Sequence, residues 1–196
     1  MSATPKIGRR LRPGDLGRIV ALHGRLYSRE YGVDSTFEAH VGAGVARAAA
    51  RGWPRDSEGV WLVEREGELA GCIAYTDEGD GLATLRWFVL DPSVRGQGLG
   101  RRLVGELLDE VQAKGFDRIR LETFSELRRA AGIYLAHGFE LTHTETSPRW
   151  GREAITYQHY ELELAGRPQS ISTTAPPRRG SPPPSSLPSS GSRATA

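Results

Sequence analysis

The residues best suited to chemistry lie in the run Arg-Gly-Gln-Gly-Leu-Gly-Arg-Arg, residues 95–102, which brings three glycines and three arginines together. An apolar, partly β-branched run of strand length, 82–90, precedes it and stops at Asp91-Pro92. Apolar side chains then recur at helical spacing, at Leu99, Leu103, Leu107, Leu108 and Val111. A helix therefore begins at the glycines, where its first N–H groups have no partner and carry the positive end of the dipole. This arrangement predicts a site for an anion.

Glycine at these positions lets the backbone approach a phosphate group closely, and the arginines add cationic side chains. The run is not a P-loop, because no Gly-Lys-Ser/Thr follows it. It also departs from the dinucleotide-binding fingerprint, because either register puts Arg101 or Leu103 where the third glycine belongs. Glu122, which lies 22 residues beyond Gly100, does match the acidic residue of that fingerprint. A nucleotide-dependent oxidoreductase therefore stays an alternative.

A better match is the pattern Arg/Gln-x-x-Gly-x-Gly/Ala, which Arg95, Gly98 and Gly100 satisfy. This run resembles the coenzyme A pyrophosphate loop of the GNAT superfamily of N-acetyltransferases. A second stretch, 130–140, resembles the other cofactor motif of that family, a helix that carries a tyrosine, here Tyr134, and closes with Gly-Phe. An ordinary glycine-rich loop would explain the first motif alone. The two motifs in the family's order favour an enzyme that uses acetyl-CoA as its cosubstrate.

The resemblance also implies which residues bind the coenzyme. In the family, a bulge in the strand before the loop splays the sheet, and free backbone N–H groups hold pantetheine and the thioester oxygen. The matching residues are Phe88, Val89 and Leu90. A structural alternative is that these three are simply residues of a core strand. Because the backbone does the binding, both readings can hold. The loop itself contributes Arg95, Gly96, Gln97, Gly98, Leu99, Gly100 and Arg101.

Acetyl transfer from a thioester to an amine needs a neutral nucleophile, a site for the oxyanion and a proton for the departing thiolate. By resemblance, the Tyr134 hydroxyl lies near the coenzyme sulfur, and its pKa of about 10 suits a general acid. A tyrosine that only packs on the helix face is the structural alternative. The family often has asparagine seven residues earlier, where this chain has Leu127. Glu122 is the first candidate for the general base, and Glu30 and Glu38 are the next candidates. The structural alternative is that each of these carboxylates is only solvated or salt-bridged.

Composition limits the class of protein. The chain has 196 residues, which suits one domain, and its hydrophobic content of 38% is enough for a core. No run of about 18 apolar residues and no secretory signal is visible, so we expect a cytoplasmic protein that does not enter membranes. A single cysteine, Cys72, excludes an internal disulfide and a cysteine-based zinc site, and no histidine spacing suggests a metal.

Charge and composition change near residue 165. The formal net charge is +2, but the segment 166–196 holds four arginines and no acid, so the remainder carries −2. A body of that charge is not expected to bind nucleic acid. The segment 166–196 is rich in serine and proline with almost nothing to bury, which predicts a disordered tail after a domain of residues 1–165.

The order of the predicted elements matches the GNAT fold over residues 6–164. That fold is α+β, of the α/β/α type: a mixed, mostly antiparallel sheet of about seven strands, splayed between the fourth and fifth, with about four helices. Strands are predicted at 6–12, 59–65, 69–76, 82–90, 117–123, 139–146 and 153–164, and helices at 15–31, 35–51, 98–114 and 125–137. Ser35 and Glu38 stand in capping-box relation at the second helix, and a loop at 147–152 joins the last two strands.

More narrowly, residues 11–17, 23–32 and 34–38 resemble the acetyltransferase half of bacterial proteins that fuse a MarR-type repressor to this enzyme. The acceptor is expected to be a primary amine of a small molecule, peptide or protein. Asp34, Glu30 and Glu38 favour a cationic acceptor, whereas Arg149 and Arg152 favour an anionic one, and the two indications cancel. A homodimer is compatible with the fold. A coenzyme A-binding regulatory module with little turnover is the second functional hypothesis.

Overall fold

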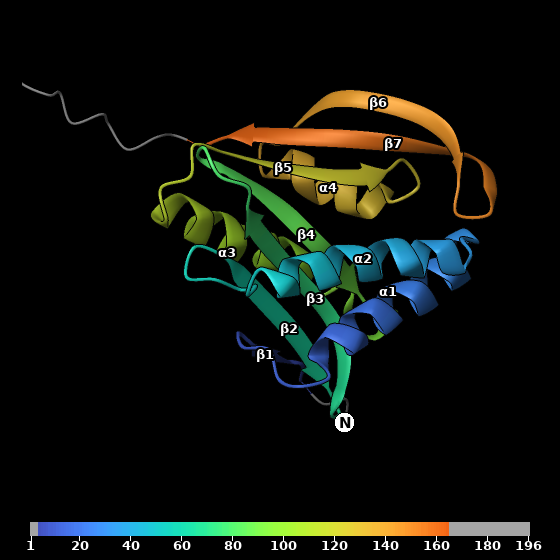
Figure 1. Ribbon diagram of the computed structural model, residues 1–196, viewed down its shortest axis with the longest axis horizontal. Coiled ribbons are helices and arrows are strands. Elements are labelled where there is room, and N and C mark those ends of the chain that lie inside the picture. The colour runs from blue at the N-terminus through green and yellow to red at the C-terminus, as the bar shows by residue number, and fades with distance from the viewer. Residues whose placement is uncertain (1–3, 165–196) are drawn as a thin grey trace, which may run out of the picture.

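The computed structural model describes residues 4–164, which form one seven-stranded sheet with two helices on each face (Figure 1). In chain order the elements are β1 (Lys6–Gly8), α1 (Asp15–Tyr31), α2 (Ser35–Ala50), β2 (Gly59–Arg65), β3 (Glu68–Asp77), β4 (Leu82–Leu90), the 3-10 turn η1 (Pro92–Val94), α3 (Leu99–Ala113), β5 (Arg118–Phe124), α4 (Arg128–Ala136), β6 (Glu140–Arg149) and β7 (Arg152–Glu163). The predicted α+β fold with seven strands and four helices is confirmed.

The sheet has the strand order β1-β2-β3-β4-β5-β7-β6, and β4–β5 is its one parallel pair among the described residues. This pair is short: Leu82, Ala83 and Thr84 face Arg118, Ile119 and Arg120. Although β4 continues to Leu90 and β5 to Phe124, no further pairing joins them. The two strands therefore diverge, so the sheet is splayed between its fourth and fifth strands, as predicted.

Two hydrophobic cores hold the splayed sheet. The first lies under α1 and α2, where Ile19, Leu22 and Leu26 are at most 2% exposed. The second lies under α3 and α4 and includes Leu103 and Leu107, both fully buried. Each buried leucine or isoleucine stabilises the fold by roughly 1.5–3 kcal/mol. Because each half of the sheet is packed against helices, the gap between β4 and β5 does not collapse.

The local structure corrects three sequence predictions. The capping box at α2 is wrong: Asp34, not Ser35, caps the helix, and its side chain accepts from the Thr36 N–H at 2.9 Å. The first strand ends at Gly8 rather than at residue 12. Helix α4 begins at Arg128, three residues later than predicted, because the Ser125 N–H is bonded to the Thr156 carbonyl of β7.

The loop predicted at 147–152 is also wrong. Strand β6 runs to Arg149 and β7 begins at Arg152, so only Trp150 and Gly151 form the turn. Both have positive φ, 54° and 74°, as a two-residue hairpin turn of type I′ requires. Trp150 is buried and packs edge-on against Phe37 of α2, with ring centroids 4.8 Å apart. The turn therefore closes against a helix.

The predicted disordered tail, 166–196, lies outside the described residues. Within residues 4–164, no helix is both long enough and apolar enough to cross a bilayer.

Gly71 gives a direct test of the sheet geometry beside the splay. It faces Leu90 in the register of β3 and β4, and an added Cβ would lie 2.5 Å from Leu90 Cδ2 and 2.9 Å from the Val89 carbonyl oxygen. Because backbone cannot move aside easily, Gly71→Ala should lower the free energy of unfolding by about 1–3 kcal/mol, measured by urea denaturation.

The matched control is Gly105→Ala in the interior of α3, where the nearest atom to an added Cβ is His137 Nε2 at 3.6 Å. That contact is ordinary, so the change should stabilise the protein by about 0.5–1 kcal/mol. Equal effects of the two alanines would contradict the packing described here.

Candidate functional site

The divergence of β4 and β5 is bordered by two cavities. The loop cavity, of about 840 Å³, lies between the end of β4, the glycine-rich run and the start of α4. The sheet cavity, of about 320 Å³, lies between α2, β4 and the strands β5 and β7. Tyr27, Phe88 and Leu127 line both cavities, so the two meet at these side chains. The two cavities are therefore neighbours that share these three side chains as lining.

A bulge in β4 shapes this meeting point. Cys72 faces Val89 and Ala74 faces Arg86, so two residues of β4 stand opposite the single residue between them on β3. Trp87 has a φ of 48°, and its carbonyl oxygen accepts a hydrogen bond from Cys72 Sγ at 3.0 Å. The predicted residues Phe88, Val89 and Leu90 follow at once, and all three line the loop cavity. Beyond Thr84, the edge of β4 that faces β5 has no strand partner.

The glycine-rich run forms the opposite wall of the loop cavity. Gly96 and Gly98 have φ of 82° and 74°, a conformation that glycine adopts without strain. Gly98 is the N-cap of α3 and supplies no side chain, so the first N–H groups of the helix have no side-chain cap. The cavity is lined by six of the seven predicted loop residues, Arg95, Gly96, Gly98, Leu99, Gly100 and Arg101. The seventh, Gln97, is exposed and does not line it.

Arg95 is paired within the protein. Its Nη1 and Nη2 donate to the two carboxylate oxygens of Glu30, each at 2.9 Å, and its Nε donates to the Leu90 carbonyl at 2.7 Å. Such a bidentate, charge-assisted pair is strong and geometrically specific. It ties the loop to α1 and to the end of β4. The guanidinium charge is thereby largely matched, and Glu30 is not a free base.

Sequence reasoning missed two cations of the loop cavity, Arg128 and Arg129. Both are exposed in the first turn of α4 and line the cavity across from Arg101. The sequence does contain them as an Arg-Arg pair. That signal could not place them, because only the packing of α4 against α3 brings them to the loop.

Tyr134 of α4 is 4% exposed and lines the sheet cavity, beside Phe88 with ring centroids 6.2 Å apart. Burial raises the pKa of its hydroxyl, so the group keeps its proton at neutral pH. No hydrogen bond joins this hydroxyl to another residue of the described part of the chain, which leaves its O–H free to donate to a ligand.

Tyr27 of α1 is a second hydroxyl at the meeting point, and sequence reasoning missed it. Burial, and then the nearby Tyr134, raise its pKa well above the usual value. Its ring stacks on Phe37, with centroids 4.6 Å apart. Nothing in its spacing distinguishes it from the other buried positions of α1.

The three candidate bases differ in their surroundings. Glu122 of β5 is exposed, lines the sheet cavity and forms no ion pair with the described residues. Glu30 is paired with Arg95, and Glu38 lies against Gly24 of α1 and lines neither cavity. Of the three, Glu122 has the free carboxylate on a cavity.

His23 of α1 also lines the sheet cavity, a place that its position on the apolar face of the predicted helix did not reveal. Its Nδ1 is 2.8 Å from the Ile19 carbonyl oxygen. Burial lowers the pKa of His23 to about 4, so the ring is neutral at pH 7. With Nδ1 as the donor, Nε2 is left as an acceptor.

This histidine gives the stability a definite pH dependence. The unfolded chain binds a proton at His23 below about pH 6.5, whereas the native state does so only below about pH 4. Stability should therefore fall as the pH drops through this window, with about 2 kcal/mol lost by pH 5 from His23 alone. Urea denaturation of the wild type and His23→Asn at pH 8 and pH 5 measures the difference.

The exposed His143 provides the control, since His143→Asn should keep the wild-type pH dependence. An equal loss of stability in the wild type and His23→Asn would show that His23 is not buried in its neutral form.

The chain is similar to known acetyltransferases over most of the site. The sequence model of the acetyltransferase (GNAT) family matches residues 26–139. An N-acetyltransferase of Schizosaccharomyces pombe is 30% identical over 119 residues, which cover 59% of this chain and 71% of that protein. YjgM, an N-acetyltransferase of Escherichia coli, is 32% identical over 83 residues, 41% of this chain and 50% of YjgM. A mycothiol acetyltransferase of Beutenbergia cavernae is 37% identical over 82 residues, 41% of this chain and 28% of that protein. The matched segments thus span half or less of the last two relatives.

Solved structures show the same fold at low sequence identity. A GNAT-family acetyltransferase of Streptococcus pneumoniae superposes with a TM-score of 0.61 at 20% identity, covering 82% of this chain and 99% of that one. The ribosomal-protein-S18-alanine N-acetyltransferase of Escherichia coli superposes with a TM-score of 0.61 at 19% identity, covering 86% and 99%. Identities this low establish the fold alone.

Proposed function

The chain belongs to the acetyltransferase (GNAT) family, and we propose that it moves an acetyl group from acetyl-CoA to a primary amine by direct attack in a ternary complex. The observation that carries this proposal is the meeting of the two cavities at Tyr27, Phe88 and Leu127. Direct attack requires donor and acceptor to be held side by side, and two adjoining cavities allow it without a covalent enzyme intermediate.

The loop cavity fits the coenzyme. The uncapped N-terminus of α3 offers N–H groups to a pyrophosphate, and Arg101, Arg128 and Arg129 add positive charge around it. Backbone groups of Phe88, Val89 and Leu90, on the edge that β5 has left, are suited to the amide groups of pantetheine. Arg95 acts by holding the loop against Glu30. Acetyl-CoA, when bound, supplies the activated acetyl thioester.

The residues around the meeting point divide the work of transfer. Glu122 takes the proton from the ammonium form of the acceptor, directly or through water. The amine nitrogen then bonds to the thioester carbon, while backbone N–H groups of the bulge stabilise the oxygen that gains charge. As the carbon–sulfur bond breaks, the Tyr134 hydroxyl gives its proton to the sulfur. The acceptor nitrogen loses its second proton, through water, to the Tyr134 phenolate, which restores the hydroxyl. Burial raises the pKa of Tyr134, so the hydroxyl carries its proton at neutral pH.

Thiol release from acetyl-CoA in the presence of a panel of primary amines tests the proposal. The wild type should release thiol with at least one amine, and Tyr134→Phe should lower kcat by about 100-fold or more with little change in the KM for acetyl-CoA. Tyr160→Phe is the matched control, because Tyr160 lies beside Tyr134, with ring centroids 6.1 Å apart, and lines neither cavity. Wild-type kcat in Tyr134→Phe would remove the tyrosine from the mechanism.

The second candidate function is a coenzyme A-binding regulatory module with little turnover. Leu127 favours it, because it stands where the family often has an asparagine that bonds the coenzyme. Coenzyme binding without thiol release from any amine would support this function. The narrower resemblance to MarR-type fusion proteins and a homodimeric state remain predictions. The amine acceptor and the expectation that the protein binds neither nucleic acid nor membranes also remain predictions.

A further inference from the structure

The sheet cavity carries an excess of hydrogen-bond donors with positive charge. Arg47 and Arg51, one turn apart at the end of α2, line it together with Arg86 of β4. Neither Arg47 nor Arg51 forms an ion pair or a side-chain hydrogen bond with another residue of 4–164. Arg86 is 3.4 Å from Glu78, which also accepts from the Thr76 hydroxyl at 2.7 Å. The charge of Arg51 also lowers the pKa of Glu78, so Arg86 and Arg51 share one carboxylate, while Arg47 forms no ion pair within residues 4–164.

His40 also lines the cavity, and charges of both signs act on it. Partial burial, and then the charge of Arg149, lower the pKa of His40, with smaller contributions from Arg86 and Arg47. Glu122 acts in the opposite direction and does not outweigh them. A negatively charged group is the ligand that such a cavity favours.

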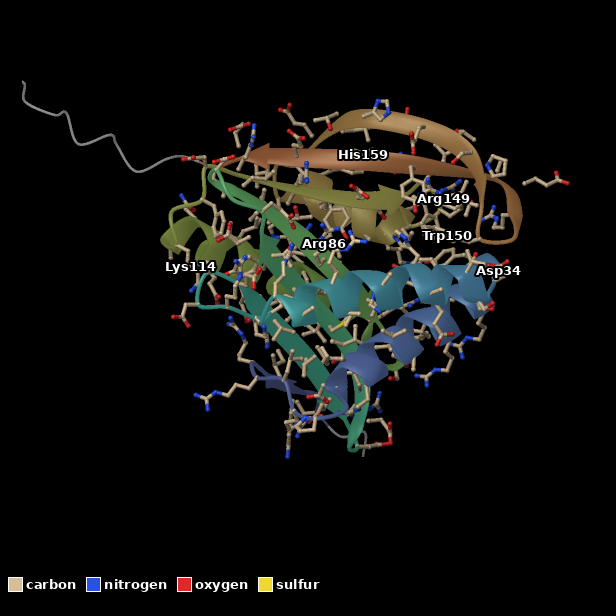
Figure 2. All side chains as sticks on the ribbon, in the orientation of Figure 1. Asp34, Arg86, Lys114, Arg149, Trp150 and His159 are labelled. Carbon is tan, nitrogen blue, oxygen red and sulfur yellow. The ribbon has the colours of Figure 1, made fainter. Side chains whose placement is uncertain are left out.

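Aromatic side chains form part of the remaining lining. Phe37, Trp87, Phe124 and Trp150 line the cavity, whose volume of about 320 Å³ suits a small molecule rather than a long chain. Figure 2 shows Arg86 and Trp150 between α2 and the strands β5 and β7.

The acidic residues that favoured a cationic acceptor in the sequence are engaged elsewhere. Glu30 pairs with Arg95, Asp34 caps α2, and Glu38 packs against Gly24. The two arginines that favoured an anionic acceptor are also engaged: Arg152 pairs with Glu126 at 2.8 Å, and Arg149 lies over the Tyr157 ring at 4.5 Å. The charge of the acceptor is therefore inferred from other arginines, those that line the sheet cavity.

We propose that the acceptor is a small amine that also carries a carboxylate and an aromatic or large apolar group, as an aromatic amino acid does. Arg47 and Arg51, with Arg86, bind the carboxylate, the aromatic walls enclose the apolar group, and the amine lies toward Glu122. This inference rests on the proposed function, because it assigns the sheet cavity to the acceptor. A neutral or polycationic amine would leave the guanidinium groups unmatched.

Binding of two probes that differ only in charge tests the anion site without turnover. In the full-length protein, 3-phenylpropionate should bind about tenfold more tightly than 3-phenylpropionamide, because a guanidinium–carboxylate contact is charge-assisted. Quenching of tryptophan fluorescence reports binding, since Trp87 and Trp150 line the cavity. The double variant Arg47→Gln/Arg51→Gln should reduce the preference to roughly twofold or less.

Arg29→Gln is the matched control. Arg29 occupies the last turn of α1 as Arg47 occupies the last turn of α2, and it lines neither cavity. If Arg47 and Arg51 only stabilise the negative end of the helix dipole, both sets of variants will lower the melting temperature and leave the preference unchanged. That result would overturn the inference, as would equal affinity for the two probes or no binding of either at about 10 mM, far above the expected affinity range.

Turnover separates this inference from the proposed function. Thiol release should be faster with L-phenylalanine than with L-phenylalaninamide or 2-phenylethylamine, which lack the carboxylate. Release with the latter two but not with L-phenylalanine would overturn the inference and leave the acetyltransferase standing. Carboxylate binding without thiol release from any amine would overturn the proposed function and leave the anion site.

Discussion

The divergence of β4 from β5 is the feature on which the site depends. Two parallel strands that begin paired at Leu82–Arg118 separate after Thr84, and a bulge at Trp87 turns the rest of β4 away. Backbone groups that would otherwise bond a neighbouring strand are left facing the loop cavity. An unpaired backbone donor in a protein interior is unfavourable unless water or a ligand satisfies it. The coenzyme proposed above, which carries amide groups, is a ligand suited to such backbone groups.

Other interactions hold this opening in place. Helices α1 and α2 pack on one side of it and α3 and α4 on the other, so each half of the sheet is stable without the missing strand pairing. The Arg95–Glu30 pair then connects the glycine-rich run to α1, and both residues line the loop cavity. The Asp91 side chain accepts from the Ser93 N–H at 2.9 Å and fixes the turn before the run. The turn before the run and the first residue of the run are thus fixed by contacts within the protein.

The elements were predictable because each has a local signal: the apolar run of 82–90, the helical spacing after Gly98 and the glycine stops at Gly32 and Gly115. Contacts between distant parts of the chain carry no such signal. Arg95 was expected to face a ligand, but its partner Glu30 is 65 residues away. Tyr27, His23 and Arg128 reach the cavities through helix packing, and the hairpin at Trp150 is set by its contact with Phe37. The residue types of the site were readable, while their pairing required the tertiary structure.

The most direct test of the account is the thermal stability of the protein with acetyl-CoA, coenzyme A or NAD, for the wild type, Gly98→Ala and Gly98→Trp. Both variants share the strain of a side chain at a φ of 74°, and only tryptophan fills the space beside the helix N-terminus. At 100 times the Kd, acetyl-CoA should stabilise the wild type by about 2.7 kcal/mol, a rise in Tm of roughly 5–10 °C. Coenzyme A should act similarly, NAD should have no effect, and the shift should persist in Gly98→Ala and vanish in Gly98→Trp. No shift with acetyl-CoA at millimolar concentration, or an undiminished shift in Gly98→Trp, would contradict the assignment of the loop cavity to the coenzyme.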